Sequence, residues 1–232
     1  MKKYLLLISA IFNIALTSYL SIIRPFGMLD QKTISDLYTT LITPAGVTFS
    51  IWSIIYLSWF ALWLYIFKYP KKIKKKSVYL LILAQTLSTL WLIPSQLWYI
   101  SISFAVMIWL LITLTILLNK KQKNTHVSWV IQLFFWWILV AFIANFHQTL
   151  VYFGIYFFPV ILSIASIVLG SIINRNILKQ YCKYIPSLVF IWALVGILIA
   201  QENQYILATA AISILFLVTD LWKTFLLTEK KS

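Results

Sequence analysis

Long apolar segments fill most of the chain and are separated by short polar or basic stretches. A hydrocarbon core of about 30 Å is crossed by roughly 20 apolar residues in a helix. Segments of about that length cover residues 4–23, 47–67, 77–95, 98–118, 127–147, 151–173, 185–200 and 205–226. They lack the half-polar alternation of strands in a membrane barrel. The pattern therefore predicts an all-α integral membrane protein with about eight transmembrane helices.

Two apolar stretches are too long for one helix and require a turn at the membrane surface. As a single helix, residues 77–118 would extend about 63 Å, roughly twice the thickness of the bilayer core. We expect this stretch to turn at Pro94, Ser95 and Gln96, because proline interrupts a helix. The second stretch, residues 185–226, is expected to turn at the polar residues Gln201 to Gln204.

Composition supports the same class of protein. Of the 232 residues, 62% are hydrophobic, 17% are aromatic and only 10% are charged, and a soluble domain could not bury that much apolar surface. A secretory signal is the alternative interpretation of the first segment, because Lys2 and Lys3 precede it. That segment is longer than a signal core of roughly 7–15 residues and lacks an A-x-A-like cleavage pattern, so we interpret it as a retained helix.

Basic residues are distributed unequally between the two ends of these helices. Of the 19 Lys and Arg residues, all but Arg24 and Lys32 fall on one side of the predicted bundle. Positively charged loops remain in the cytoplasm, so both termini are predicted to be cytoplasmic in a multi-pass cell-membrane protein. The net charge of +14 is thus a signal of topology, and nucleic acid is not an expected partner.

The sequence contains no arrangement typical of catalysis or of a structural metal site. Its one cysteine, Cys182, is expected to be inert, and its two histidines, His126 and His147, lie near helix ends. Asp220 is the one acidic residue well inside an apolar segment, and we expect Lys223, three residues later, to pair with it near the interface. We therefore expect no enzyme activity, no metal and no resident cofactor.

The longest loop expected on the outer side covers residues 24–46. Residues 33–36 form an [ST]-x-x-[DE] pattern typical of a helix start, and Leu37, Tyr38 and Leu41 would give the helix an apolar side. A short amphipathic helix lying across the outer mouth of the bundle is one hypothesis. A polar loop without regular structure is the other, and the sequence favours neither.

Aromatic residues are the remaining candidates for a functional site. Trp52, Tyr56, Trp59 and Trp63 recur at i, i+4, i+7 and i+11, which places them on one face of a helix. Such a stripe is equally compatible with ordinary packing. Tryptophans at a membrane interface are normal anchors, and we assign that role to Trp63, Trp98, Trp129 and Trp222.

Two segments with these aromatic residues resemble the tryptophan-rich sensory proteins, also called the TspO/MBR or translocator protein family. In that family a proline-rich start of the second helix is followed by Trp and, four residues later, by Tyr. Here Pro44 precedes Trp52 and Tyr56. The family's third helix has Asn followed at +3 by Trp, where this chain has Ser88 and Trp91.

A third segment strengthens the resemblance. The family's fifth helix carries Trp, Ala at +4 and Asn at +8, as do Trp137, Ala141 and Asn145 here. The order of helices also agrees over roughly residues 1–150. The resemblance thus implies a TspO-like five-helix core in residues 1–150, extended by three further transmembrane helices in residues 151–232, as in longer bacterial relatives.

The resemblance implies a pocket that opens toward the outer loop. Its lining would be Trp52, Tyr56, Trp91, Trp137 and Ala141, with Ser88 and Asn145 as polar contacts. Members of the family bind porphyrins and other flat hydrophobic ligands, and some bind sterols; porphyrin faces stack well on indole and phenol rings. A single proline replaces the family's double proline, and Ser88 lacks the expected amide, so the identity of the ligand stays open.

Three functions follow as alternatives. We favour a membrane protein that binds a tetrapyrrole-like hydrophobic molecule and has a sensory or transport role. The second is an energy-coupled secondary carrier of a small solute, for which Asp220 and Pro159 give slight support. The third is an enzyme that degrades bound porphyrin under light, as proposed for some relatives. A homodimer is also left open, since small residues could pack between copies or within the chain: Gly154, Ser163, Ala165, Ser166 and Gly170.

Overall fold

The computed structural model describes residues 2–69, 73, 75–120, 125–181 and 184–229. Within this part of the chain every regular element is a helix. The α-helices are α1 (Lys2–Ile23), α2 (Gln31–Leu37), α3 (Ile51–Lys68), α4 (Lys75–Gln96), α5 (Ile100–Asn119), α6 (Thr125–Tyr152), α7 (Pro159–Tyr181), α8 (Ile185–Ala200) and α9 (Gln204–Glu229). Two 3-10 helices, η1 (Pro25–Gly27) and η2 (Gly46–Ser50), precede α2 and α3. The predicted all-α class is confirmed.

Most of these helices are suited to a bilayer. Among the described residues, six helices are long and apolar enough to cross a membrane: α3 with η2, α4, α5, α6, α7 and α9. A seventh span results if α1 and the segment Pro25–Leu37, bent by 79°, are counted together. The helix α8 has only 16 residues, about 24 Å at 1.5 Å per residue, which is shorter than the hydrocarbon core. All eight predicted segments are therefore helical, but α8 does not reach spanning length.

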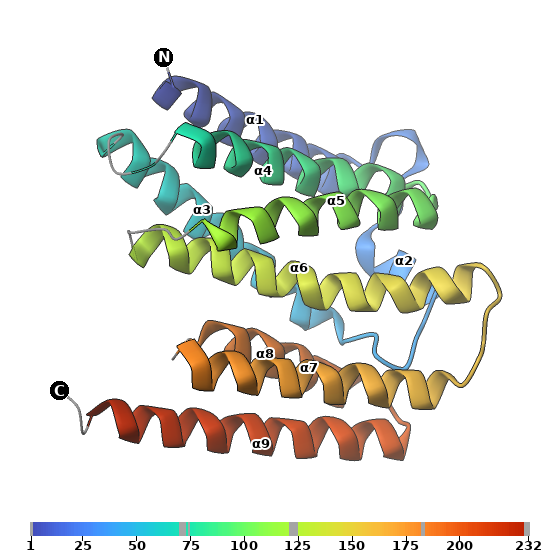
Figure 1. The fold of residues 1–232 in the computed structure, drawn as a ribbon. Helices are drawn as coiled ribbons and strands as arrows, with labels where there is room; N and C mark the ends of the chain where they lie inside the picture. Colours follow the sequence, from blue (N-terminus) through green and yellow to red (C-terminus); the bar gives the residue numbers. More distant parts are fainter. Residues whose placement is uncertain (1, 70–72, 74, 121–124, 182–183, 230–232) are drawn as a thin grey trace.

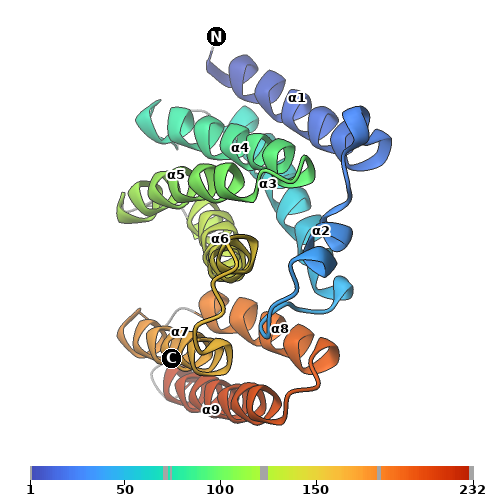
Figure 2. The same cartoon turned by 90° about the vertical axis from the view of Figure 1, so that its right-hand side faces the viewer.

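Helix α6 lies in the middle of the bundle (Figure 2). The helices α1, α3, α4 and α5 lie on one side of it, and α7, α8 and α9 lie on the other. Figure 1 shows both termini at one end of the bundle, while α2 and the α6–α7 loop lie at the opposite end. Which end of the bundle faces the cytoplasm stays a prediction from the basic residues.

The α4–α5 hairpin turns later than the sequence predicts. Helix α4 continues through Pro94 to Gln96, so the expected turn at residues 94–96 is wrong. Proline close to the end of a helix costs only one backbone hydrogen bond. The chain reverses at Trp98, whose φ of 72° is left-handed, and the Tyr99 amide donates to the Pro94 carbonyl at 2.8 Å.

The boundary between α6 and α7 also differs from the prediction. Helix α6 extends to Tyr152, and α7 begins at Pro159 instead of residue 151. Positive φ angles at Gly154 (70°) and Phe158 (46°) end the helical path between them. Pro159 suits the first position of a helix. Gly154 therefore lies in a loop and is not part of a close-packing face on α7.

The exposure of the tryptophans corrects one assignment. Trp98, Trp129 and Trp222 are 49%, 45% and 63% exposed, as interface anchors require. Trp63 is only 2% exposed, and its ring lies 6.0 Å from that of Trp59. Because this face of α3 is buried in the bundle core, the anchor role predicted for Trp63 is wrong.

Asp220 has a different partner from the one predicted. Its carboxylate lies 2.9 Å from Nε of Arg175 on α7, whereas Lys223 is exposed. The N–H of Arg175 is not aligned with the carboxylate, so we describe the contact as an ion pair and not as a hydrogen bond. The sequence argument considered neighbours along one helix only, and here the partner comes from another. Cys182 and the side chain of His126 lie outside the described residues.

Candidate ligand pocket

Trp52 stands at the centre of an aromatic cluster formed by α3, α4 and α6. Its ring stacks on Tyr56 and on Trp91, with centroids 5.7 Å and 6.4 Å apart. Phe134 and Trp137 approach the same indole edge-on at 6.2 Å. Both stacked and edge-on pairs are favoured by the charge distribution of aromatic rings. Aromatic residues predicted separately on three helices thus meet in one place.

A cavity begins at this cluster and extends to α2, at the end of the bundle opposite the termini. The space not occupied by protein atoms is about 850 Å³, and part of it is open to solvent. Its lining comes from six parts of the chain: Gln31, Ser35, Ile42, Thr43, Pro44, Phe49, Trp91, Trp137, Val140, Ala141, Ile143, Ala144, Asn145, Gln148, Ser166, Ile167, Phe190, Ala193, Leu194 and Ile197.

The residues predicted for the site divide into two groups. Four of them line the cavity: Trp91, Trp137, Ala141 and Asn145. The other three do not: Trp52, Tyr56 and Ser88. Trp52 contacts both Trp91 and Trp137 in the aromatic cluster, and Tyr56 stacks on Trp52. Ser88 is buried in α4 one turn before Trp91. Whether any of the seven contacts a ligand stays a prediction.

Three buried polar atoms in the lining residues have no hydrogen-bond partner within the described part of the protein. They are Nε1 of Trp91, Nε1 of Trp137 and Oδ1 of Asn145. These residues are only 7%, 2% and 4% exposed. Leaving a buried polar group unpaired costs about 1–3 kcal/mol. Because none of the three atoms is exposed at the cavity surface, a ligand would pair with them only after a neighbouring side chain moves aside.

Helix α8 forms a wall of the cavity that the sequence did not reveal. Phe190, Ala193, Leu194 and Ile197 are all buried and all line the cavity. Their spacing of i, i+3, i+4 and i+7 places them on one helix face. This spacing could have predicted a buried face of α8. It could not have predicted that this face of α8 lines the pocket, because the facing residues of α6 lie more than 40 positions earlier in the chain.

Hydrogen bonds hold the segment before α3 against α8. The Ala45 amide donates to the Gly196 carbonyl at 2.9 Å, and Nε1 of Trp192 donates to the Thr48 carbonyl at 2.9 Å. Nε2 of Gln201, the residue after α8, donates to the carbonyls of Thr40 and Thr43 at 3.2 Å and 2.7 Å. Pro44, between these contacts, lines the cavity. The C-terminal part of the chain therefore positions this pocket wall.

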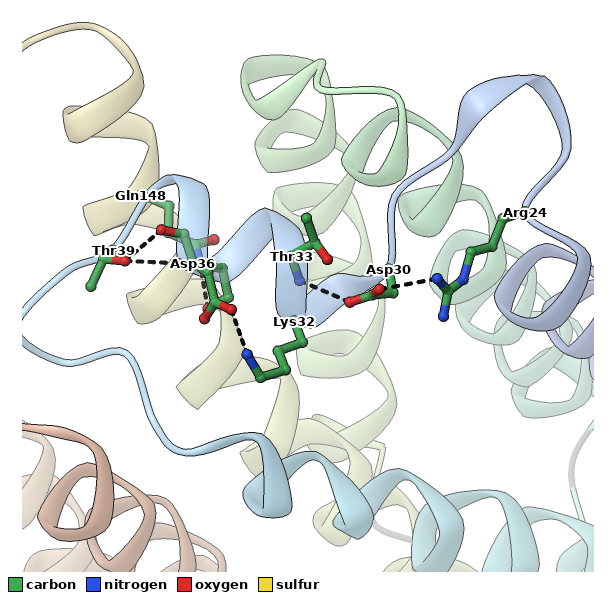
Figure 3. Close-up of polar contacts among 8 residues, drawn as sticks. Arg24, Asp30, Lys32, Thr33, Asp36, Thr39 and Gln148 are labelled. Carbon is green, nitrogen blue, oxygen red and sulfur yellow. Dashed lines mark hydrogen bonds and ion pairs between the residues drawn. The ribbon is translucent and has the colours of Figure 1, made fainter.

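The short helix α2 lies over the cavity at the end of the bundle opposite the termini, which confirms the helix hypothesis for this loop (Figures 1 and 3). Its predicted apolar side is wrong, because the helix ends at Leu37, which is exposed, before Tyr38 and Leu41. It buries Ile34 and Ser35 instead.

Nε2 of Gln148 on α6 donates to Oγ of Ser35 at 3.3 Å. Nε2 of Gln31 donates to Oγ of Ser95 on α4 at 2.9 Å. Gln31, Ser35 and Gln148 also line the cavity. The hydrogen bonds that hold α2 to α4 and α6 therefore lie at the edge of the cavity.

The start of α2 differs from the predicted pattern. Asp30 is the N-cap, and its Oδ1 accepts from the Thr33 amide at 2.8 Å. Thr33 is therefore inside the helix and does not cap it. The Asp30 carboxylate also pairs with Arg24 at 3.1 Å, while Asp36 pairs with Lys32 on the exposed side (Figure 3). The hydrogen bond from the Thr33 amide lowers the pKa of Asp30 most; burial opposes it, and the Thr33 side chain and then the positive charge of Arg24 lower the pKa further.

Replacing Asp30 with alanine is expected to loosen α2. Loss of an N-cap costs about 1 kcal/mol, so amides of residues 31–37 should exchange with solvent about fivefold faster. Since the folded pKa is depressed, the capping contribution is present above the ordinary aspartate pKa of 3.8 and is lost as pH falls below it. Hydrogen exchange at neutral and acidic pH measures both effects. Asp36→Ala, on the exposed side, should change little; equal exchange in both variants would contradict the cap.

Comparison with known proteins connects this geometry to one family. A protein-family model described as TSPO-like protein matches residues 3–222. The match includes α7, α8 and most of α9, and is not limited to the residues 1–150 that carry the aromatic motifs. The chain matches no curated protein and no solved structure.

Proposed function

The chain belongs to the TSPO-like protein family, and we propose that it binds a flat hydrophobic, tetrapyrrole-like ligand in the cavity between α6 and α8, in a sensory or transport role. One observation carries the proposal. The motif residues Trp137, Ala141 and Asn145 line a cavity beside an aromatic cluster, and two of them hold unpaired polar atoms. An apolar wall with a few unpaired polar atoms is typical of small-molecule sites.

The shape of the lining favours a flat molecule. Ala141 and Ala144 of α6 and Ala193 of α8 line the cavity with small side chains from both walls. Indole rings at its inner end supply faces and edges on which an aromatic ring system stacks. If the side chains of Trp91, Trp137 and Asn145 rotate to bring their buried polar atoms to the cavity surface, edge groups of a tetrapyrrole would accept from the indole N–H groups, and its pyrrole N–H groups would donate to Oδ1 of Asn145.

An energy-coupled secondary carrier is the second candidate. One observation favours it: Asp220, 6% exposed, lies inside a membrane-crossing helix, where acidic residues often serve transport. Asp220 is already paired with Arg175, and neither residue lines the cavity. We therefore place ligand binding first. We also propose binding without turnover, and the porphyrin-degrading enzyme is retained as an outcome that the test below distinguishes.

Replacing Ala141 with phenylalanine is expected to weaken porphyrin binding at least tenfold, or about 1.4 kcal/mol. The phenyl ring would occupy the space between the small side chains of α6 and α8. Quenching of tryptophan fluorescence by protoporphyrin IX measures the affinity of the protein in lipid nanodiscs. Wild type should quench saturably at micromolar ligand, and Trp137→Leu should weaken quenching as well.

Ala61→Phe is the matched control, because Ala61 is exposed on α3 away from the cavity. It should bind like wild type. Linear quenching that is insensitive to all three substitutions would mean partitioning into lipid and would contradict the pocket. Consumption of porphyrin under illumination, with an identified product, would support the enzyme instead. Solute uptake into proteoliposomes that Asp220→Asn abolishes would support the carrier.

A further inference from the structure

A second cavity lies beside the proposed ligand pocket, among α6, α7 and α8. It contains about 700 Å³ not occupied by protein atoms, part of it open. Its lining is apolar apart from Ser166 and Asn174. Val140, Ile143, Ser166 and Phe190 line both cavities. Only one layer of side chains therefore separates the second cavity from the pocket.

The outer edge of the second cavity faces the bilayer. Leu169 and Ile173 on α7 line it and are 58% and 46% exposed. Both lie within the membrane-crossing segment Pro159–Leu178, so hydrocarbon surrounds them. Helix α6 packs mainly against α5 and α8, and α7 packs mainly against α9 and α8. The boundary between α6 and α7, which we call the seam, is thus only partly closed by direct contact of the two helices, with Nε2 of His147 and Oγ of Ser166 hydrogen-bonded across it at 3.1 Å.

Phe190 of α8 stands at the boundary between the two cavities. A methyl group added at Gly170 would lie 2.4 Å from Cζ of Phe190, so the ring rests directly against the backbone of α7. This contact uses Gly170 within the chain, not toward a second copy. The ring has no polar atom and makes no hydrogen bond. Phe190 is the largest of the four side chains that line both cavities, together with Val140, Ile143 and Ser166.

The opposite route, from water past α2, is narrowed but not closed, since part of the pocket is open to solvent. Helix α2 lies over the pocket and is bonded to α4 through Gln31 and Ser95 and to α6 through Ser35 and Gln148. A flat hydrophobic ligand is concentrated in the bilayer rather than in water, because burial of apolar surface is favourable. The apolar path from the lipid therefore matches both the location of such a ligand and its chemistry.

We propose that the seam between α6 and α7 is a lateral entrance from the bilayer to the ligand pocket, with Phe190 as its inner partition. This inference rests on the proposed function, since the molecule that passes is the flat hydrophobic ligand of that pocket. Leu169 and Ile173 form the lipid-facing rim of the entrance. The rim and the partition control the rate of exchange, whereas the residues around Trp137 and Ala141 control affinity.

The test is the kinetics of binding in lipid nanodiscs. Protoporphyrin IX is delivered from lipid vesicles, and tryptophan quenching is followed by stopped flow. Narrowing the rim with Leu169→Phe and Ile173→Phe together should slow association and dissociation about tenfold each, with an unchanged equilibrium constant. Phe190→Ala should accelerate both rates. Ile172→Phe is the matched control, since Ile172 is exposed on the same helix but does not line the second cavity.

Each result decides between distinct outcomes. If wild type binds saturably and Ala141→Phe weakens binding, but the rim variant keeps wild-type rates, the entrance is overturned and the pocket remains. A weaker equilibrium constant with unchanged association in the rim variant also overturns the entrance, because these residues would then belong to the site itself. Absence of saturable binding in wild type overturns the proposed function and the entrance together. Both rim positions are exposed to lipid, so the substitutions leave the folded core intact.

Discussion

Replacing Gly196 with valine is expected to lower the free energy of unfolding by about 3 kcal/mol and to abolish porphyrin binding. A Cβ atom at this position of α8 would lie 1.9 Å from Oγ1 of Thr48 and 2.9 Å from Cβ of Pro44. Neither neighbour can yield easily. Thr48 is 1% exposed, and the ring of Pro44 has little freedom.

The loss of binding follows from what Gly196 holds in place. Its carbonyl accepts from the Ala45 amide at 2.9 Å, and the adjacent Pro44 lines the pocket. Pushing α8 away from this segment would therefore displace two walls of the cavity at once. Thermal unfolding in detergent measures the stability change, and fluorescence quenching by protoporphyrin IX measures the binding.

Ala200→Val is the control for Gly196→Val, because it adds a β-branched side chain to the same helix at an exposed position. It should leave stability and binding close to wild type. Normal stability together with normal binding in Gly196→Val would mean that α8 and the segment before α3 do not need this close approach. The role of α8 as a pocket wall would then be wrong.

Interactions local to one helix could be predicted from the sequence. The helices follow from apolar length, and the aromatic face of α3 follows from the 3.6-residue period. The motif of Trp137, Ala141 and Asn145 also lies on a single helix, and all three residues line the cavity. In these cases every residue that the inference needs is within a few turns of the others.

Contacts between distant helices could not be predicted in this way. Nothing in residues 185–200 indicates that Gly196 lies against Pro44, more than 140 residues earlier, or that Ala193 lines the same cavity as Pro44. The burial of Trp63, against its expected anchor role, depends on which helices cover α3. Helix ends are a further case, because Trp98 and Phe158 adopt positive φ angles that their residue types do not favour.

The ion pair of Arg175 and Asp220 is another contact between helices that the sequence did not predict, and the last prediction concerns this pair. Replacing Arg175 with alanine is expected to destabilise the protein by about 3–5 kcal/mol, because it leaves a buried carboxylate without its charge partner. The Asp220 side chain is 7% exposed, whereas that of Arg175 is 38% exposed. Asp220→Asn should therefore reduce the free energy of unfolding by clearly less. Arg175 is partly exposed and can extend toward water, and its guanidinium also contacts the Phe216 ring, with Cζ 4.4 Å from the ring centroid.

Thermal unfolding of both single variants and of Arg175→Met with Asp220→Leu tests this asymmetry. The double variant should recover most of the stability, because it removes both charges and keeps the volume between α7 and α9. Porphyrin binding should persist in Asp220→Asn, since Asp220 does not line the pocket. Equal losses in the two single variants would contradict a pair whose energetics are dominated by the buried carboxylate. Full stability of Asp220→Asn with loss of solute uptake would instead identify Asp220 as a transport residue. An amide fills the same space as the carboxylate but lacks the negative charge that coupled transport would need.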